Sequence, residues 1–133
     1  MAKRDRLDIP EPKIDQKITF SFEFYDIVCK YCISQWGQNK TLETLKRLRE
    51  INRKTVKELF HDKRVYHFHP VDWSETIEKK GFPEENANKL EAYQFSLLGI
   101  NNQKAGVYGA VSRNIFYIVW FDLEHAIWPT FKK

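Results

Sequence analysis

The hydrophobic and polar pattern of the chain predicts four β-strands. In residues 18–25 every second side chain is apolar and those between are mostly polar, a pattern typical of a strand with one buried face. Residues 93–98, 106–112 and 115–121 are also strand-like. The last segment has two apolar faces: Ile115, Tyr117, Val119 and Phe121 on one, and Phe116, Ile118 and Trp120 on the other. A strand with two apolar faces is predicted to lie centrally in its sheet.

The residues between the first strand and the other three are predicted to be largely helical. One helix is expected over residues 26–36, and a shorter one over 55–61 with Val56, Leu59 and Phe60 facing inward. The main helix is expected to begin near Thr41, which can act as its N-cap. Its apolar residues recur at three-residue spacing and are interpreted as one buried stripe: Leu42, Leu45, Leu48 and Ile51.

This order of elements predicts an α+β fold. It comprises an N-terminal strand, two or three helices and a three-stranded antiparallel meander. Residues 1–16, rich in charge and containing two prolines, are expected to be a flexible tail, and residues 17–133 a single domain. Pro70 confines any strand in its neighbourhood to the edge of the sheet. The sequence contains neither a membrane-spanning apolar run nor a signal-peptide core, so we expect a cytoplasmic protein without a membrane partner.

Positive charge is concentrated in one part of the chain. The protein carries a formal net charge of +4, whereas residues 40–64 hold nine basic and four acidic side chains, a local charge of +5. Such a segment indicates a polyanionic or acidic partner, and the alternative is an ordinary solvated helix face. The residues expected to contact phosphate are Lys46, Arg47, Arg49, Arg53, Lys54 and Lys57. Tyr108 and Trp128 are candidate platforms for stacking bases.

A histidine and a carboxylate follow the last strand, and they are the leading catalytic candidates. A histidine side chain can exchange a proton near neutral pH, so His125 can act as acid or base, with Asp122 as its orienter. RNA cleavage by its own 2′-OH requires a base, an acid and a cation near the phosphate, but no metal or cofactor. Residues that can complete this set are His67, His69, Lys104 and Arg113. The alternative is that Asp122 and His125 form a structural turn.

Two further patterns suggest metal or redox chemistry, but the sequence favours simpler interpretations. His67 and His69 could bind a metal together with Asp122, as in a metal-dependent nuclease, although such sites need three or four converging ligands. Cys29 and Cys32 have the spacing of half a zinc knuckle or of a redox pair. No second cysteine pair exists, so they are interpreted as buried thiols that act as small apolar groups.

The order of the elements resembles that of the RelE/ParE-like toxin superfamily, whose members often end in a strand followed by histidine and tyrosine. His125 and Trp128 occupy these places. Residues 64–129 also resemble a group of small uncharacterised bacterial proteins through three motifs. These are His69-Pro70-Val71-Asp72-Trp73, Gln94-Phe95-Ser96 and Phe116-Tyr117-Ile118-Val119-Trp120. The chain departs from the toxins in having Gly106 where they often have an arginine, and Ala126 after the histidine.

The resemblance implies the toxin of a toxin–antitoxin pair, a metal-independent endoribonuclease acting on RNA, in some cases at the ribosome. It also implies an acidic antitoxin as protein partner. The alternative is a non-catalytic module that uses the basic helix face to bind nucleic acid or protein.

Overall fold

Five strands form one mixed sheet in the order β1-β5-β4-β3-β2. The computed structural model describes residues 16–28, 30–61, 66–97, 99–102 and 104–129. The strands are β1 (Thr19–Ser21), β2 (His69–Pro70), β3 (Glu91–Ser96), β4 (Gly106–Ser112) and β5 (Ile115–Asp122), and the α-helices are α1 (Gln38–Asn52) and α2 (Val56–His61). The fold is mixed α+β, as predicted. β3, β4 and β5 are antiparallel neighbours, but the sheet is wider than a three-stranded meander because β1 pairs parallel with β5 and β2 antiparallel with β3.

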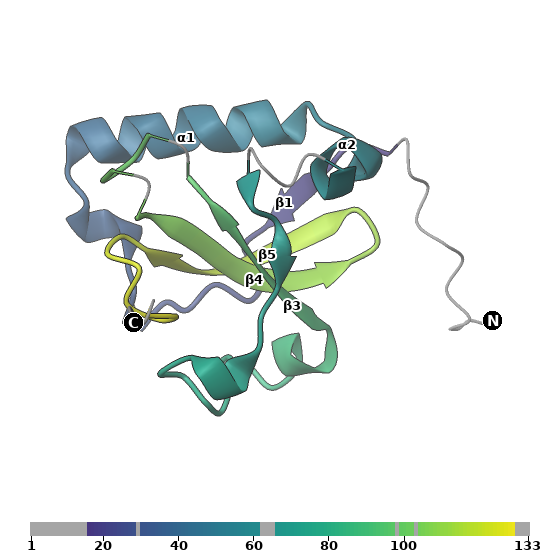
Figure 1. Ribbon diagram of the computed structural model, residues 1–133, viewed down its shortest axis with the longest axis vertical. Helices are drawn as coiled ribbons and strands as arrows, with labels where there is room; N and C mark the ends of the chain where they lie inside the picture. Colours follow the sequence, from purple (N-terminus) through teal and green to yellow (C-terminus); the bar gives the residue numbers. More distant parts are fainter. Residues whose placement is uncertain (1–15, 29, 62–65, 98, 103, 130–133) are drawn as a thin grey trace, which may run out of the picture.

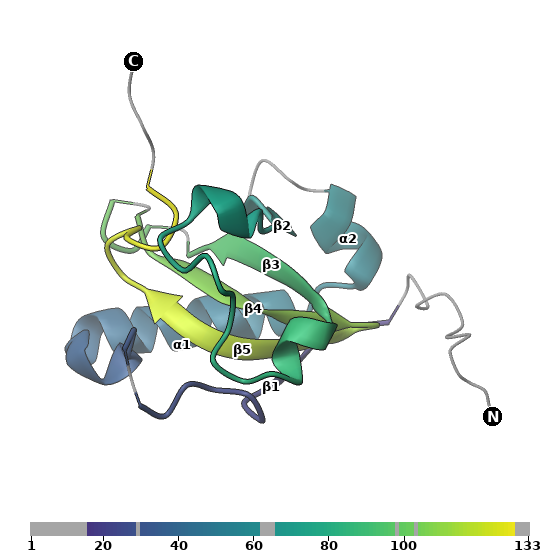
Figure 2. The same ribbon diagram turned by 90° about the horizontal axis from the view of Figure 1, so that it is seen from below.

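The sheet is covered on both faces, and we call the face under α1 the helix face. Figure 1 shows α1 above the sheet and the long segment between β2 and β3 beneath it; Figure 2 gives the view turned by 90°. On the helix face, Leu48 and Ile51 of α1 belong to the same buried cluster as Phe95 and Phe116 of the sheet. The opposite face is buried by a second cluster, which includes Phe82, Tyr108, Val119, Trp120 and Ile127. Burial on both faces explains why β5 is apolar throughout.

A β-bulge in β5 changes which side chains share a face. Tyr108 pairs with Trp120 and Gly109 with Ile118, so Val119 is an extra residue without a partner in β4. Val119 and Trp120 consequently both lie in the cluster opposite the helices, and Phe121 returns to the helix face. The predicted alternation therefore holds through Val119 and is wrong for Trp120 and Phe121, whose faces are exchanged.

The segment after β1 is not the helix that was predicted over residues 26–36. It consists of turns and a short 3₁₀ helix, Ile33–Gln35. The physical reason is that Asp26 anchors it to the sheet. Its carboxylate accepts hydrogen bonds from Trp120 Nε1 at 2.9 Å and from the Val28 N–H at 3.1 Å, and its own N–H donates to the Val119 carbonyl. The predicted strand over 18–25 is also shorter, and Phe22 lies exposed just beyond its end.

Helix α1 begins at Gln38, earlier than expected, and Gly37 rather than Thr41 is its N-cap. Its apolar residues do not form one buried stripe. Leu48 and Ile51 are buried, but Leu42 and Leu45 are 52% and 54% exposed. In an α-helix each three-residue step falls about 60° short of a full turn. Over the three steps from Leu42 to Ile51 the shortfall reaches about 180°, so these two side chains point to opposite sides of the helix.

The remaining helix and the edge strand agree with the sequence. α2 buries Val56 and Leu59, and a capping box starts it: the Thr55 N–H donates to Glu58 Oε1 at 2.8 Å, and the Glu58 N–H donates to Thr55 Oγ1 at 3.1 Å. The Thr55 N–H bond is also the main reason that the pKa of Glu58 lies below its usual value. β2, which contains Pro70, lies at the sheet edge as predicted. In the described part of the chain, no helix is long and apolar enough to span a membrane.

We predict that Gly109→Ala destabilises the fold, because a Cβ at this position would lie 2.2 Å from the Tyr117 carbonyl oxygen and 2.4 Å from the Phe116 ring. Both neighbours belong to the paired, buried strand β5, so the expected loss in the free energy of unfolding is about 1–3 kcal/mol. Urea denaturation measures this loss. Ser112→Ala, at the partly exposed end of β4, serves as the control and should change the free energy of unfolding by less than about 0.5 kcal/mol.

Candidate functional site

Three of the predicted catalytic residues, Lys104, Asp122 and His125, lie at one end of the sheet and a fourth, Arg113, lies at the other. Lys104 precedes β4 and His125 follows β5, and since these strands are antiparallel both residues are at the same end. Their loops are joined by a 2.9 Å hydrogen bond from Asn101 Nδ2 to the Leu123 carbonyl. Arg113 lies in the β4–β5 turn, at the opposite end of the same strands. A phosphate bound near His125 would therefore lie at the same end of the sheet as Lys104 and at the opposite end from Arg113.

Asp122 is buried and fixes the turn that contains His125. Its carboxylate accepts hydrogen bonds from the Ala126 N–H at 3.0 Å and the Ile127 N–H at 2.8 Å. Its relative exposure is 2%. His125 sits inside this turn with φ of 59°, a left-handed conformation that is uncommon for histidine. These bonds give Asp122 a structural role; its orienting role toward His125 stays a prediction.

The other two candidate histidines lie on and just before β2. His69 packs its ring edge-on against Trp128, with centroids 5.2 Å apart, and Trp128 Nε1 donates to Glu75 Oε1 at 3.2 Å. His67 is exposed and has a left-handed backbone with φ of 52°. Among the described residues, no three His, Cys, Asp or Glu side chains are placed to hold a metal ion. The metal-dependent alternative therefore gains no geometric support.

Tyr108 is fully buried, so its ring offers no face for a nucleic-acid base, contrary to the expectation of a stacking platform. Its hydroxyl is buried and has no hydrogen-bond partner among the residues that the structure describes. Burial raises the pKa of Tyr108, and the neighbouring Asp122 carboxylate raises it further. Burial likewise raises the pKa of Tyr31, whose hydroxyl donates to Glu78, which itself pairs with Lys30 at 2.8 Å. Both phenols therefore stay neutral over the physiological pH range.

A shallow hollow of about 270 Å³ lies beside Asp122 at the end of β5. Lys30 and Gln35 contribute to its wall, together with the exposed Glu124. Cys32 also lines it and is disulfide-bonded, so the interpretation of the cysteines as buried thiols is wrong for this residue. Cys29 lies outside the described residues.

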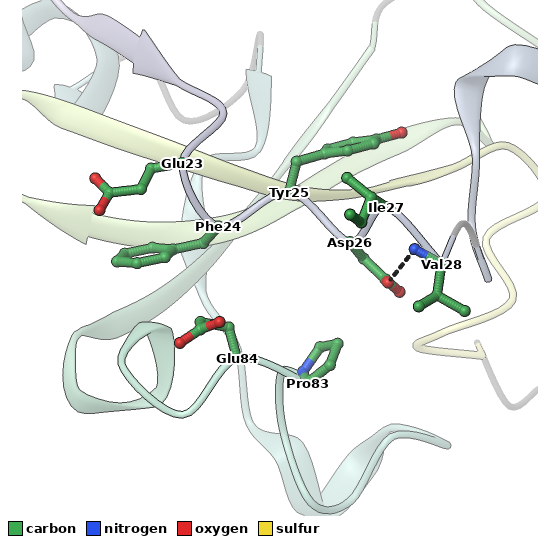
Figure 3. A pocket seen from close by; sticks show the side chains of 8 residues that line it. All are labelled: Glu23, Phe24, Tyr25, Asp26, Ile27, Val28, Pro83 and Glu84. Atoms are coloured by element: carbon green, nitrogen blue, oxygen red, sulfur yellow. Dashed lines mark hydrogen bonds between the residues drawn. The ribbon is translucent and has the colours of Figure 1, made fainter.

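A second hollow, of about 180 Å³, is formed by residues 23–28 and 83–84 (Figure 3). Its charged side chains are the carboxylates Glu23, Asp26 and Glu84. Asp26 is already bonded to Trp120 and Val28, as described above. This hollow contains none of the residues predicted to act in catalysis or binding.

The predicted phosphate-contacting residues lie on and after α1, on the helix face. Lys46 pairs with Glu43 at 3.2 Å, and Arg47 is half-buried and pairs with Glu50 at 3.4 Å. Arg49, Arg53 and Lys57 are exposed, and Lys54 is half-buried. The His69–Trp128 pair packs instead against the cluster on the opposite face. The sheet thus separates the basic helix from these two candidates.

The sequence did not indicate the groove that lies between β1 and α1. It encloses about 430 Å³, and its walls are Thr19, Phe20, Phe22, Leu45, Leu48, Arg49 and Asn52. Phe22 and Leu45 are each more than half exposed, which is unusual for neighbouring large apolar side chains. The available signal was the three-residue leucine spacing, which requires part of the stripe to face away from the core.

Comparisons with known proteins found no match, so a functional assignment rests on the geometry described above. No family model matches the sequence, and no curated protein or solved structure matches it. The resemblance to RelE/ParE-like toxins accordingly stays a prediction.

We predict that Asp122→Ala destabilises the protein by about 1–3 kcal/mol, because it leaves the backbone N–H groups of Ala126 and Ile127 without their buried acceptor. Glu124→Ala, two residues later at an exposed position, should have little effect. The free energy of unfolding from urea denaturation tests both. Equal stabilities for the two variants would contradict the structural role of Asp122.

Proposed function

We propose that the protein is a binding module that holds an acidic segment of a partner protein in the groove between β1 and α1. The observation that supports this is the combination of exposed apolar walls with a cationic side chain. Phe22 and Leu45 present apolar surface, and Arg49 stands in the same wall. Single exposed apolar residues are ordinary, but a groove that gathers several marks an interaction site.

The charge around the groove favours an acidic partner. Within the described residues, the ion pairs of α1 involve Lys46 and Arg47, and Arg49 belongs to neither. Arg53 follows Arg49 by four residues and so lies one turn further along the same side of the helix. A carboxylate-bearing segment would meet these guanidinium groups, which bind carboxylates in a fork-like geometry.

Apolar walls favour protein over nucleic acid. A phosphate backbone would gain from Arg49 and Arg53 but nothing from burying the aliphatic side chain of Leu45. A peptide with apolar side chains gains roughly 25 cal/mol for each Å² of apolar surface removed from water. Binding of protein therefore depends on Leu45 as well as on the cationic residues. Binding of RNA would use the cationic residues and base stacking on the phenylalanine rings of the groove, but not Leu45.

We predict that Leu45→Ser weakens binding of acidic, apolar peptides at least about tenfold, because it removes apolar contact area from the groove. The probe is a panel of synthetic dodecapeptides in which valine or isoleucine alternates with glutamate or aspartate, measured by fluorescence anisotropy. Ile77→Ser is the matched control, since Ile77 is 57% exposed, comparable to Leu45 at 54%, but lies outside the groove.

A charge-reversed pair completes the design. Arg49→Glu should abolish binding, and Arg113→Glu, which reverses an exposed cation in the β4–β5 turn, should not. The proposal fails if no peptide of the panel binds. It also fails if single-stranded RNA binds and Leu45→Ser leaves that binding unchanged.

Metal-independent RNA cleavage is a second candidate function. It is favoured by one observation, the hydrogen bond that joins the loops of Lys104 and His125 and brings a cation and an imidazole to the same end of the sheet. In this proposal His125 acts as acid or base and Lys104 stabilises charge on the phosphate. An acidic antitoxin would then be the natural occupant of the groove.

We predict that His125→Asn lowers RNA cleavage in EDTA by about 10²–10⁴-fold if this second proposal holds. Asparagine is chosen because it tolerates the left-handed backbone of His125 but cannot transfer a proton at neutral pH. His61→Asn, at the exposed end of α2, is the control. Cleavage by folded His125→Asn at the wild-type rate would refute the role of His125, and no cleavage by the wild type would refute the activity.

A further inference from the structure

We infer that the partner segment binds as an additional β-strand along the open edge of β1, with its acidic side chains directed to α1. This inference rests on the proposed function, because it specifies how the groove is used. Strand addition at an exposed sheet edge is a general mode of peptide recognition, in which backbone hydrogen bonds set the register and alternate side chains enter pockets.

The open edge follows from the strand order and the register. Among the described residues, β1 is the first strand of the sheet and has β5 as its one neighbouring strand. The Thr19 N–H donates to the Asn114 carbonyl at 2.9 Å, and Thr19 is aligned with Ile115. In a parallel ladder with this alignment, Thr19 and Ser21 direct their peptide groups to β5. The N–H and C=O of Phe20 therefore point to the open side.

Hydrogen bonds within the described residues occupy peptide groups at the two ends of this edge, and the peptide groups of Phe20 lie between them. At the start, the Ile18 N–H donates to the Lys54 carbonyl at 3.1 Å, and the Ile18 carbonyl accepts from Asn52 Nδ2 at 2.8 Å. Beyond the end, the Phe22 carbonyl accepts from the Tyr25 N–H at 3.0 Å. Phe20 lies between these closed positions and in the groove wall. An added strand thus pairs with Phe20 and places its side chains against Leu45.

Charge selects a partner protein over two other occupants. A second copy of the chain added edge to edge would bring Arg49 of one copy near Arg49 of the other, and like charges facing each other are unfavourable. Residues 1–15 of the same chain hold four basic and four acidic side chains, so they offer no net negative charge. An acidic segment of another protein satisfies both the open peptide groups and the cationic wall.

Amide hydrogen exchange of the full-length protein, resolved by residue with NMR, tests the inference. The probe is the tightest dodecapeptide of the alternating panel described above. On saturation, exchange of the Phe20 N–H should slow at least about tenfold, because it becomes the donor to the added strand. The Thr19 N–H, already bonded within the sheet, is the internal control and should change less than about twofold.

A peptide with the same sequence but N-methylated at alternate residues separates backbone from side-chain recognition. It keeps every side chain and loses the donors of one edge, so its affinity should fall at least about tenfold. If the parent peptide binds while Phe20 exchange and N-methylation have no effect, strand addition is wrong and the proposed function stands. If no peptide binds, the proposed function fails together with this inference.

Phe20 exchange in the protein without peptide tests the two other possible occupants of the edge, residues 1–15 and a second copy of the chain. Phe20 exchange that is already slow, and independent of protein concentration, would assign the edge to the chain's own residues 1–15. Slow exchange that appears only as the concentration rises, with a doubled mass by light scattering, would assign it to a second copy. Either result overturns the inference; fast exchange in the free protein at all concentrations is the expected one.

Discussion

The β-bulge opposite Gly109 is the constraint on which both the core and the candidate site depend. It inserts Val119 as an extra residue, so that Val119 and Trp120 share the face opposite the helices and Phe121 lies on the helix face, the reverse of regular alternation for Trp120 and Phe121. Phe121 packs edge-on against Trp36 on the helix face, with ring centroids 5.7 Å apart. Trp120 contacts Trp73 and Phe82 on the other face. Without the bulge Phe121 would leave the helix cluster, and the segment before α1 would lose its anchor.

The same bulge positions the residues that follow β5, up to Trp128. Because alternation resumes after it, Asp122 faces away from the helices and can receive the N–H groups of Ala126 and Ile127. Those bonds fold the chain back over the sheet, where Trp128 meets His69 of the edge strand. The bulge in β5 thus helps to bring Trp128, which follows β5, into contact with His69 of the edge strand β2. Bulges often redirect side chains in this way near functional sites.

Local patterns predicted the elements whose stabilising contacts are close in sequence. The apolar residues of 55–61 predicted α2, which the bonds between Thr55 and Glu58 stabilise locally, and Pro70 predicted an edge strand. The prediction failed where distant contacts decide. Asp26 stops a helix through a bond to Trp120, ninety-four residues away in sequence. The bulge has no local signature other than Gly109, and the two roles of the leucines in α1 become visible only when the helical rotation is followed from Leu42 to Ile51.

The two edges of the sheet are protected by different means, and the difference supports a binding role for β1. β2 is two residues long, and one of them is Pro70, which lacks an N–H to offer another strand. β1 contains no proline, and its start is closed by Asn52 and Lys54 instead. That protection stops short of Phe20, at the point where the apolar walls of the groove begin. An edge left open beside apolar and cationic side chains is a hazard for aggregation unless a specific partner covers it, so its retention in so short a strand favours a functional explanation.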